Sequence, residues 1–151
     1  AKRKKSLGEL GELFGIKALV DESFEKIENL NDTKMNYPFA DLYAEKDGKK
    51  YVISIKARNK YQKNGTLNSR YKLGSNAYSK AKYAAKEWKA EAYWMAVQFD
   101  KKRVSIYFGS LAELNQSNGI PLKKCMLGTV GKCLVEDKRH YFDFSYFDNK
   151  E

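Results

Sequence analysis

The dipeptide Asp47-Gly48 constrains the fold more than any other feature of the sequence. It lies between two apolar runs, which cover residues 36–45 and 50–57. Asp-Gly between two such runs is a strong signal for a β-hairpin with a tight turn. The second run carries Val52, Ile53 and Ile55 close together, as in a strand that is buried on both faces. The sequence therefore predicts a hairpin whose second strand lies in the middle of a sheet.

The segments around this hairpin predict a mixed α/β fold. Helical spacing predicts a helix over residues 6–19, and a short strand is expected at 24–30. After the hairpin, the pattern predicts a helix at 75–90, strands at 91–99 and 103–109, a short helix from Ser110 to Leu114, and a strand at 139–146. A chain of 151 residues suffices for one core and is short for two. We therefore expect a single domain over residues 1–151 with a central mixed sheet flanked by helices.

Three glycines within the first predicted helix indicate a close approach. Gly8, Gly11 and Gly15 lie on or near one side of that helix. Each glycine weakens a helix by about 1 kcal/mol relative to alanine. Three of them in one helix suggest a surface that another part of the molecule approaches closely.

The charge of the chain points to a polyanionic partner. Lys and Arg together number 29 and Asp and Glu number 19, which gives a net charge of +10. Neutralising phosphates with such a surface releases condensed counterions, so nucleic acid is favoured. No apolar run approaches the roughly 20 residues that cross a bilayer, and the basic N-terminus does not resemble a signal peptide. We expect a cytoplasmic DNA-binding protein that does not enter a membrane.

The residue types that could carry catalysis are few. The chain has two cysteines, Cys125 and Cys133, and one histidine, His140, which make a poor zinc site. Two reduced thiols are the simpler interpretation. Nuclease classes that depend on several histidines are also disfavoured. Any acid-base or metal chemistry must therefore depend on carboxylates and lysines.

One carboxylate and one lysine fall on the predicted hairpin, Asp41 in the first arm and Lys56 in the second. Phosphodiester hydrolysis uses a divalent cation to activate water and neutralise charge. Such hard cations take oxygen ligands, usually one or two carboxylates with several waters. A lysine beside the cation can orient or deprotonate the water. Each residue also has a simpler interpretation: Asp41 as an aspartate in a turn or edge strand, and Lys56 as a solvated lysine on a strand.

These residues resemble the signature of the PD-(D/E)XK nucleases. That signature is Pro-x-x-Asp, here Pro38 to Asp41, followed on the next strand by acid-x-Lys, here Ser54-Ile55-Lys56. A preceding helix with Gly-Glu is also usual in the family, and this chain has Gly8-Glu9 and Gly11-Glu12. The resemblance implies a nuclease-like α/β core and an Mg²⁺-dependent endodeoxyribonuclease, with Mn²⁺ able to replace Mg²⁺ and no other small-molecule cofactor.

The chain departs from the family pattern at Ser54, where an acid is usual. The metal would then depend mainly on Asp41, the backbone carbonyl of Ile55, and either Glu9 or Glu12, with Gln62 or Gln98 as compensating side chains. Ser54 is either a weak neutral ligand or a small core hydroxyl. This departure also keeps open a non-catalytic DNA-binding domain.

Within that superfamily the chain looks most like the cyanobacterial homing endonucleases encoded by group I introns in transfer-RNA genes. This resemblance implies a sequence-specific cut in double-stranded DNA by a homo-oligomer, either a dimer or a tetramer. A structure-specific nuclease like the Holliday junction resolvases is the alternative on the same scaffold. The aromatic tail, with Tyr141, Phe142, Phe144, Tyr146 and Phe147, is a candidate interface or an edge strand packed on its own core.

The segment from residue 58 to 74 is the expected DNA-contacting region. It is either a long loop or a loop with a short ribbon of its own. Side chains of Arg, Lys, Asn and Gln can bond to base edges in the major groove, and lysines on the next helix can contact phosphates. The candidates are Arg58, Asn59, Lys60, Gln62, Lys63, Asn68, Arg70, Lys72, Lys80 and Lys86.

Overall fold

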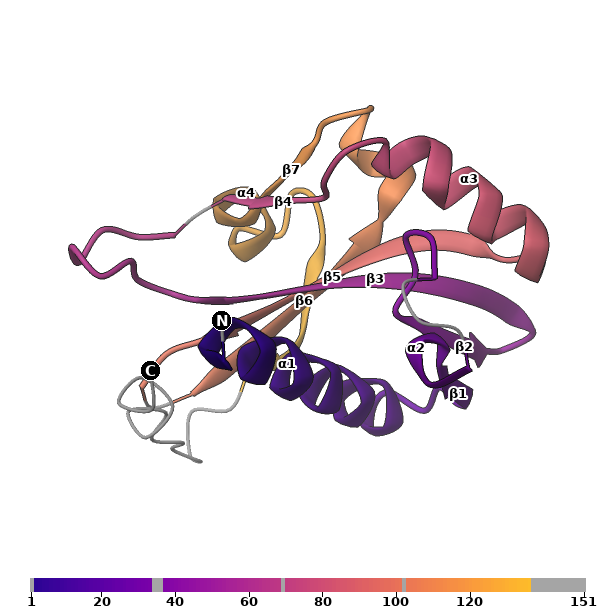
Figure 1. Cartoon of the computed structure of the whole chain (residues 1–151), viewed down its shortest axis with the longest axis horizontal. Coiled ribbons are helices and arrows are strands. Elements are labelled where there is room, and N and C mark those ends of the chain that lie inside the picture. The colour runs from indigo at the N-terminus through magenta and orange to yellow at the C-terminus, as the bar shows by residue number, and fades with distance from the viewer. Residues whose placement is uncertain (1, 34–36, 69, 102, 137–151) are drawn as a thin grey trace.

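The structure is a computed structural model that describes residues 2–33, 37–68, 70–101 and 103–136 (Figure 1). The strand predicted at residues 139–146, the aromatic tail and His140 lie outside these ranges. No helix in the described ranges is long and apolar enough to cross a lipid bilayer.

A sheet of six strands forms the centre of the molecule, in the order β1-β2-β3-β5-β6-β8. The strands are β1 (Glu25–Asn29), β2 (Leu42–Lys46), β3 (Lys49–Asn59), β5 (Glu91–Phe99), β6 (Val104–Ser110) and β8 (Lys132–Glu136). Strand β3 pairs in parallel with β5, whereas the other neighbours are antiparallel. The sheet is therefore mixed, as the sequence predicts.

The predicted hairpin joins β2 to β3. Asp47 and Gly48 both have positive φ, 51° and 80°, which is the geometry of the turn that matches the twist of two antiparallel strands. Val52 and Ile53 are fully buried, because β3 has a strand on each side and a packed layer on each face. The first arm is shorter than predicted, since β2 begins only at Leu42.

Two layers cover the faces of the sheet (Figure 1). Helix α1 (Lys2–Asp21) lies across one face, over a core that includes Ile53, Met95 and Phe99. The other face is covered by α3 (Ala77–Trp88), the ribbon of β4 (Arg70–Lys72) and β7 (Gly119–Pro121), the 3-10 helix η1 (Leu111–Leu114) and α4 (Leu122–Met126). Segment β4–α3 is the crossover that a parallel β3–β5 pair requires.

Helix α1 approaches the sheet closely where it has glycines. A Cβ at Gly11 would stand 2.5 Å from the Cβ of Ala57 on β3, and a Cβ at Gly15 would stand 3.0 Å from the sulfur of Met95. The predicted close approach is confirmed at these two positions. Gly8 has nothing within 4 Å of its hypothetical Cβ. The helix also begins at Lys2, four residues before the predicted start.

Candidate active site

A cavity of about 550 Å³ lies where β3 extends beyond the end of β2. Its walls come from the first half of α1, the start of β2, the second half of β3 and the segment that follows. The lining residues are Leu7, Gly8, Glu12, Asp41, Ile55, Lys56, Ala57, Arg58, Asn59, Tyr61, Gln62, Lys63 and Asn68. Two carboxylates, one partly buried lysine and a polar basic rim therefore face one space.

Asp41 is held in this cavity by its backbone and by its side chain. Its N–H donates to the carbonyl of Ile53 at 2.8 Å, and its carbonyl accepts from Leu30 at 2.9 Å. Its Oδ2 accepts from the N–H of Ile55 at 2.7 Å. Because β2 begins only at Leu42, opposite Ile53, no residue of that strand reaches Ile55 on this edge, and the carboxylate takes its place. The carbonyl of Ile55 lies on the same edge as its N–H and so faces the same region.

A tight turn delivers Asp41 to this position. The N–H of Ala40 donates to the carbonyl of Pro38 at 2.6 Å, and Phe39 between them has φ of 62°. A three-residue turn of this kind is rare and strained for a bulky residue. Such strain persists where the surroundings fix the backbone, and Phe39 packs against two core clusters.

Two asparagines donate to the carboxylates of the cavity, and one of them, Asn31, connects Asp41 to Glu12 of α1. The Nδ2 of Asn31 donates to Oδ1 of Asp41 at 3.2 Å and, at 3.4 Å, to Oε2 of Glu12. The Nδ2 of Asn29 donates to Oε1 of Glu12 at 3.1 Å. Asn29 ends β1, and Asn31 lies in the short helix α2 (Leu30–Thr33). Sequence reasoning did not find either residue, although polar residues directly after a strand are a signal that it could have used.

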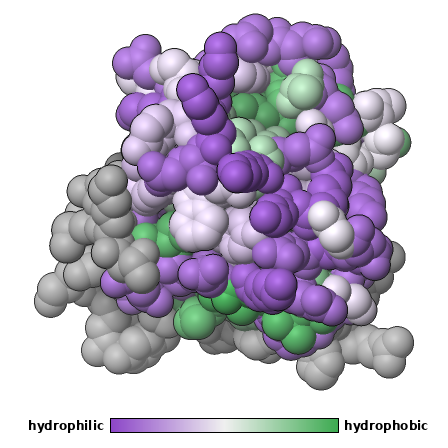
Figure 2. All heavy atoms as spheres, turned by 90° about the vertical axis from the view of Figure 1, so that its right-hand side faces the viewer, coloured by the Kyte–Doolittle hydropathy of each residue, from purple (hydrophilic) through white to green (hydrophobic). Residues whose placement is uncertain are grey.

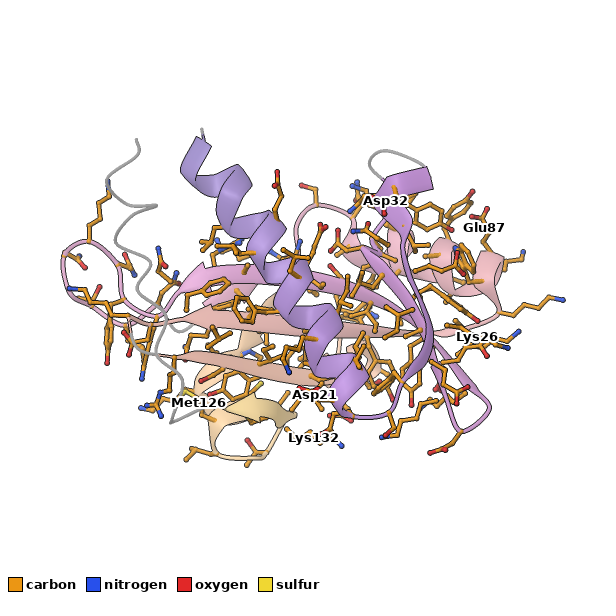
Figure 3. The ribbon with its side chains drawn as sticks, turned by 90° about the horizontal axis from the view of Figure 1, so that it is seen from below. Asp21, Lys26, Asp32, Glu87, Met126 and Lys132 are labelled. Atoms are coloured by element: carbon orange, nitrogen blue, oxygen red, sulfur yellow. The ribbon has the colours of Figure 1, made fainter. Side chains whose placement is uncertain are left out.

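The ionisable groups of the cavity are poorly solvated. Burial raises the pKa of Asp41, while hydrogen bonds from Ile55 and Asn31 and the charge of Lys56 oppose that shift. Burial also raises the pKa of Glu12, and the charges of Asp41 and of Asp32 (labelled in Figure 3) add to it. For Lys56, burial lowers the pKa, and Asp41 partly offsets this effect. All three pKa values are thus shifted towards the neutral forms.

Several predicted catalytic residues lie outside the cavity. Ser54 is buried beside Trp94, its partner across the β3–β5 pair, and does not line the cavity. Of the two interpretations of Ser54, the structure favours the core hydroxyl over the weak ligand. Glu9 is exposed on α1 and also lies away from the lining. Of the two alternatives, Glu12 is the one beside Asp41. Gln98 is buried and does not line the cavity, so it cannot replace Ser54 as a ligand.

The predicted DNA-contacting residues are divided between the cavity and other surfaces. Arg58, Asn59, Gln62, Lys63 and Asn68 line the cavity. Lys60 lies next to this group with its ammonium 5.5 Å from the ring centre of Tyr61. Lys80 and Lys86 are exposed on α3, whereas Lys72 lines a shallow hollow near the start of α3. The side chain of Arg70 lies outside the described residues. The segment after β3 extends away from the body (Figure 1).

The donor atoms of the cavity fit a hard divalent cation in part. Among the described residues, no cluster of three His, Cys, Asp or Glu side chains that could hold a metal occurs. Two carboxylates share one amide nitrogen here, and the Ile55 carbonyl faces the same region. A cation between two poorly solvated carboxylates favours the charged form of both. Mg²⁺ commonly binds one or two carboxylates and retains waters, so the residues fit Mg²⁺ or Mn²⁺.

No protein-family model and no curated protein sequence matches this chain. Among solved structures, the chain is similar to a Holliday junction resolvase from the archaeal hyperthermophile Archaeoglobus fulgidus. The two share 16% sequence identity with a TM-score of 0.60, and the match covers 83% of this chain and 95% of that chain. At this identity the likeness concerns the fold, and it confirms the predicted class: a nuclease-like α/β core with a central mixed sheet flanked by helices.

Proposed function

We propose that this chain is a metal-dependent endonuclease that hydrolyses phosphodiester bonds in DNA. One observation carries the proposal: Glu12, Asp41 and Lys56 line a single cavity that continues into a polar and basic rim. The likeness to a resolvase fold supports the same reaction class. This proposal keeps Asp41, Lys56 and Glu12 from the predicted site and leaves out Ser54 and Glu9.

In this proposal Glu12 and Asp41 hold the cation, together with the carbonyl of Ile55 and waters. Asn29 keeps Glu12 oriented through its hydrogen bond. When bound, Mg²⁺ supplies positive charge at the phosphate and lowers the pKa of a coordinated water. Mn²⁺, which also accepts oxygen ligands, serves as a substitute.

Lys56 acts on the attacking water or on the phosphate oxygens. Because burial lowers the pKa of its ammonium group, a larger fraction of Lys56 is neutral than for an exposed lysine. A neutral amine can take a proton from water, and the ammonium form can stabilise charge that develops at phosphorus. The charges of Arg58 and Lys80 add to the lowering of this pKa.

The rim of the cavity binds the DNA backbone and bases. Arg58 and Lys63 bring positive charge to the cavity mouth, and the net charge of +10 favours phosphates in general. Asn59, Gln62 and Asn68 offer amide groups that can bond to base edges. The exposed lysines of α3, Lys80 and Lys86 among them, suit contacts to phosphates further along the substrate.

A branched DNA substrate is the first candidate. The support for it is the likeness to a Holliday junction resolvase, which makes a four-way junction the substrate to test before others. The second candidate is a sequence-specific cut in linear duplex, as in homing endonucleases. What favours it is the row of amide and basic side chains after β3, which offers base-reading groups at the cavity.

Cleavage assays on matched substrates separate these possibilities. A labelled four-way junction, linear duplexes with the same arm sequences, and a plasmid library with randomised inserts would each be incubated with Mg²⁺, Mn²⁺ or EDTA. We expect metal-dependent cleavage that Asp41→Ala and Lys56→Ala abolish. Cutting of the junction alone supports the resolvase-like activity, and cutting at one recurrent insert sequence supports the homing activity. Equal cutting by both variants, or binding without cutting, would contradict the proposed site.

Cleavage of both DNA strands requires two copies of the centre. One hydrolytic site cuts one strand, so paired cuts imply two-fold symmetry of the protein on its substrate. We therefore propose a homo-oligomer, a dimer or a tetramer. Sedimentation of the full chain with uncleaved DNA tests this, and a monomer at all concentrations that cut both strands would contradict it.

A further inference from the structure

Asn29 and Asn31 both donate to Glu12, but only Asn29 has its amide orientation fixed. The Oδ1 of Asn29 accepts from the backbone N–H of Asn31 at 2.9 Å. Its Nδ2 must then be the atom that donates to Glu12. Turning this amide over would place two donors against each other and two acceptors against each other, so the orientation is locked.

The amide of Asn31 lacks such a lock. Its Nδ2 donates to both carboxylates, and within the described part of the chain no group donates to its Oδ1. A half-turn about the bond to the amide carbon exchanges two groups of similar size. That exchange would place a carbonyl oxygen where the amide nitrogen now lies, in contact distance of both Glu12 and Asp41.

A further oxygen at this place would add a third side-chain ligand to the two carboxylates. Ser54 is buried away from the lining, and within the described residues no third acidic side chain joins Glu12 and Asp41. Hard cations such as Ca²⁺ also take the carbonyl oxygens of Asn and Gln side chains as ligands in protein sites. Asn31 is the side chain that already contacts both carboxylates.

We propose that Asn31 turns its amide when a divalent cation binds and supplies Oδ1 as the third side-chain ligand beside Glu12 and Asp41. This inference rests on the proposed function. Without the cation, the NH₂ group of Asn31 lies between two like charges and keeps them together. With the cation, the same side chain offers oxygen, and Asn29 continues to hold Glu12.

The sharpest test compares the same substitution two residues apart. Asn31→Asp keeps an oxygen at the ligand position, whereas Asn29→Asp removes the donor that orients Glu12; both add one negative charge. Binding of Mn²⁺ to the full chain is measured without DNA, from the loss of the paramagnetic resonance signal of the free aqueous ion. We expect Asn31→Asp to bind Mn²⁺ at least as tightly as the unaltered chain. Asn29→Asp and Asn31→Leu should bind it about tenfold or more weakly.

A role of Asn31 as a hydrogen-bond donor alone gives a different result. Both aspartate variants would then lose affinity to a similar degree, and that outcome would overturn the inference. Asn118→Ala is a matched control, since Asn118 accepts from the N–H of Gly74 far from the cavity and its loss should leave Mn²⁺ binding unchanged. Circular dichroism of each variant, with Mn²⁺ and with EDTA, checks that it folds.

Asp41→Ala separates failure of this inference from failure of the proposed function. If this variant binds Mn²⁺ as the unaltered chain does, the metal centre is wrong and the inference fails with it. If Asp41→Ala loses the ion while Asn31→Leu retains full affinity, the metal centre stands and Asn31 is not a ligand.

Discussion

The cavity at the Lys56 end of β3 and a second cavity at the Lys49 end have similar volumes, about 550 and about 630 Å³. The second cavity lies near the hairpin turn, with walls that include Tyr51, Tyr93 and Phe108. The rings of Tyr93 and Phe108 stack with centres 4.8 Å apart. Figure 2 faces the hairpin end of the molecule and shows a mostly hydrophilic surface.

The two cavities differ in how they accommodate charge. At the hairpin end, the ammonium of Lys49 donates to the hydroxyl of Tyr93 at 2.8 Å and pairs with Glu91 at 2.7 Å. The hydrogen bond to Tyr93 raises the pKa of Lys49, which favours its charged form. At the other end, burial shifts the pKa values of Glu12, Asp41 and Lys56 towards the neutral forms. At the hairpin end the ammonium of Lys49 is paired, whereas the other end keeps poorly solvated charges at a cost to stability.

This difference indicates which ionisable side chains remain available to bind a ligand. A charged side chain that is already paired gains little free energy when a ligand binds. Charges that are poorly solvated and close together gain most when a cation or a phosphate binds, and such groups gather at functional sites. The strained turn at Phe39 lies at the same end as these groups. The predictions below test whether the two ends differ in this way.

The largest expected effect is on cleavage by Asp41→Asn. This change removes the negative charge that the proposed cation needs while keeping the size of the side chain. Because a metal ion contributes several kcal/mol to catalysis, we expect a loss of about 10³-fold or more. Initial rates at saturating Mg²⁺ measure it. Activity within a factor of a few of the unaltered chain would contradict the site.

Substitution of Lys56 should have the next largest effect. Lys56→Met should lower the cleavage rate about 10²- to 10⁴-fold, as for loss of an acid-base group. Lys56→Arg should not restore it, because a guanidinium group does not give up its proton. Since burial lowers the pKa of Lys56 below 10.5, cleavage should rise with pH through that lowered value. A rate–pH curve of unchanged shape in Lys56→Met would exclude the role as base.

Gly11→Ala should affect both the fold and the site. The new Cβ would stand 2.5 Å from that of Ala57, so α1 must move away from β3 and carry Glu12 with it. Overpacking of this kind costs about 1–3 kcal/mol. Gly8→Ala is the matched control, because its Cβ meets nothing within 4 Å. If the melting temperature of Gly11→Ala equals or exceeds that of Gly8→Ala, the close approach of α1 to β3 is contradicted.

Asp41→Asn should stabilise the fold even though it abolishes cleavage. Burial raises the pKa of Asp41 above the usual 3.8, so ionisation of Asp41 lowers stability as pH rises through the folded-state value. The uncharged side chain of the variant avoids this loss at about pH 7. The difference in stability between the variant and the unaltered chain should vanish below about pH 4, where Asp41 is protonated in both the folded and the unfolded state. In thermal melts without metal, each kcal/mol corresponds to about 2–4 °C. A lower melting temperature at neutral pH would mean that lost hydrogen bonds outweigh the relieved charge.

The smallest effect is expected at the hairpin end. Lys49→Met removes an exposed ion pair, and such pairs contribute about 0–1 kcal/mol. Cleavage should not change, since Lys49 lies in the other cavity. Melting curves and cleavage rates measured together test this. A strong loss of cleavage would mean that the two ends of β3 are not independent.

Much of the fold follows from the sequence because its signals are local. The Asp47-Gly48 turn, strand β5 at Glu91–Phe99 and the helix after β3 each carry their own periodicity or turn residues. Strand β8 was not predicted, because a short strand at the edge of a sheet shows little alternation of apolar and polar residues. The late start of β2 follows from the turn at Phe39, which depends on core packing around that ring.

The site was harder to predict because its residues meet only in the folded chain. Asp41 and Lys56 were found since one hairpin carries both, and Glu12 since it follows a glycine on the first helix. Asn29 and Asn31 come to the site through the pairing of β1 with β2, which no spacing reveals. Ser54 lies two residues before Lys56 in the same strand, yet it is buried beside Trp94 while Lys56 lines the cavity.

The base of the segment after β3 is closed by backbone hydrogen bonds. The N–H of Lys60 donates to the carbonyl of Phe99, the N–H of Asn68 donates to the carbonyl of Lys60, and Tyr61 bridges to Leu67. Insertions between Gln62 and Thr66 would therefore leave the sheet in place, and doubling such a loop costs only about 0.6 kcal/mol in closure entropy. In evolution or in engineering, the segment that we propose to contact the substrate can thus diverge while the proposed catalytic residues stay in place.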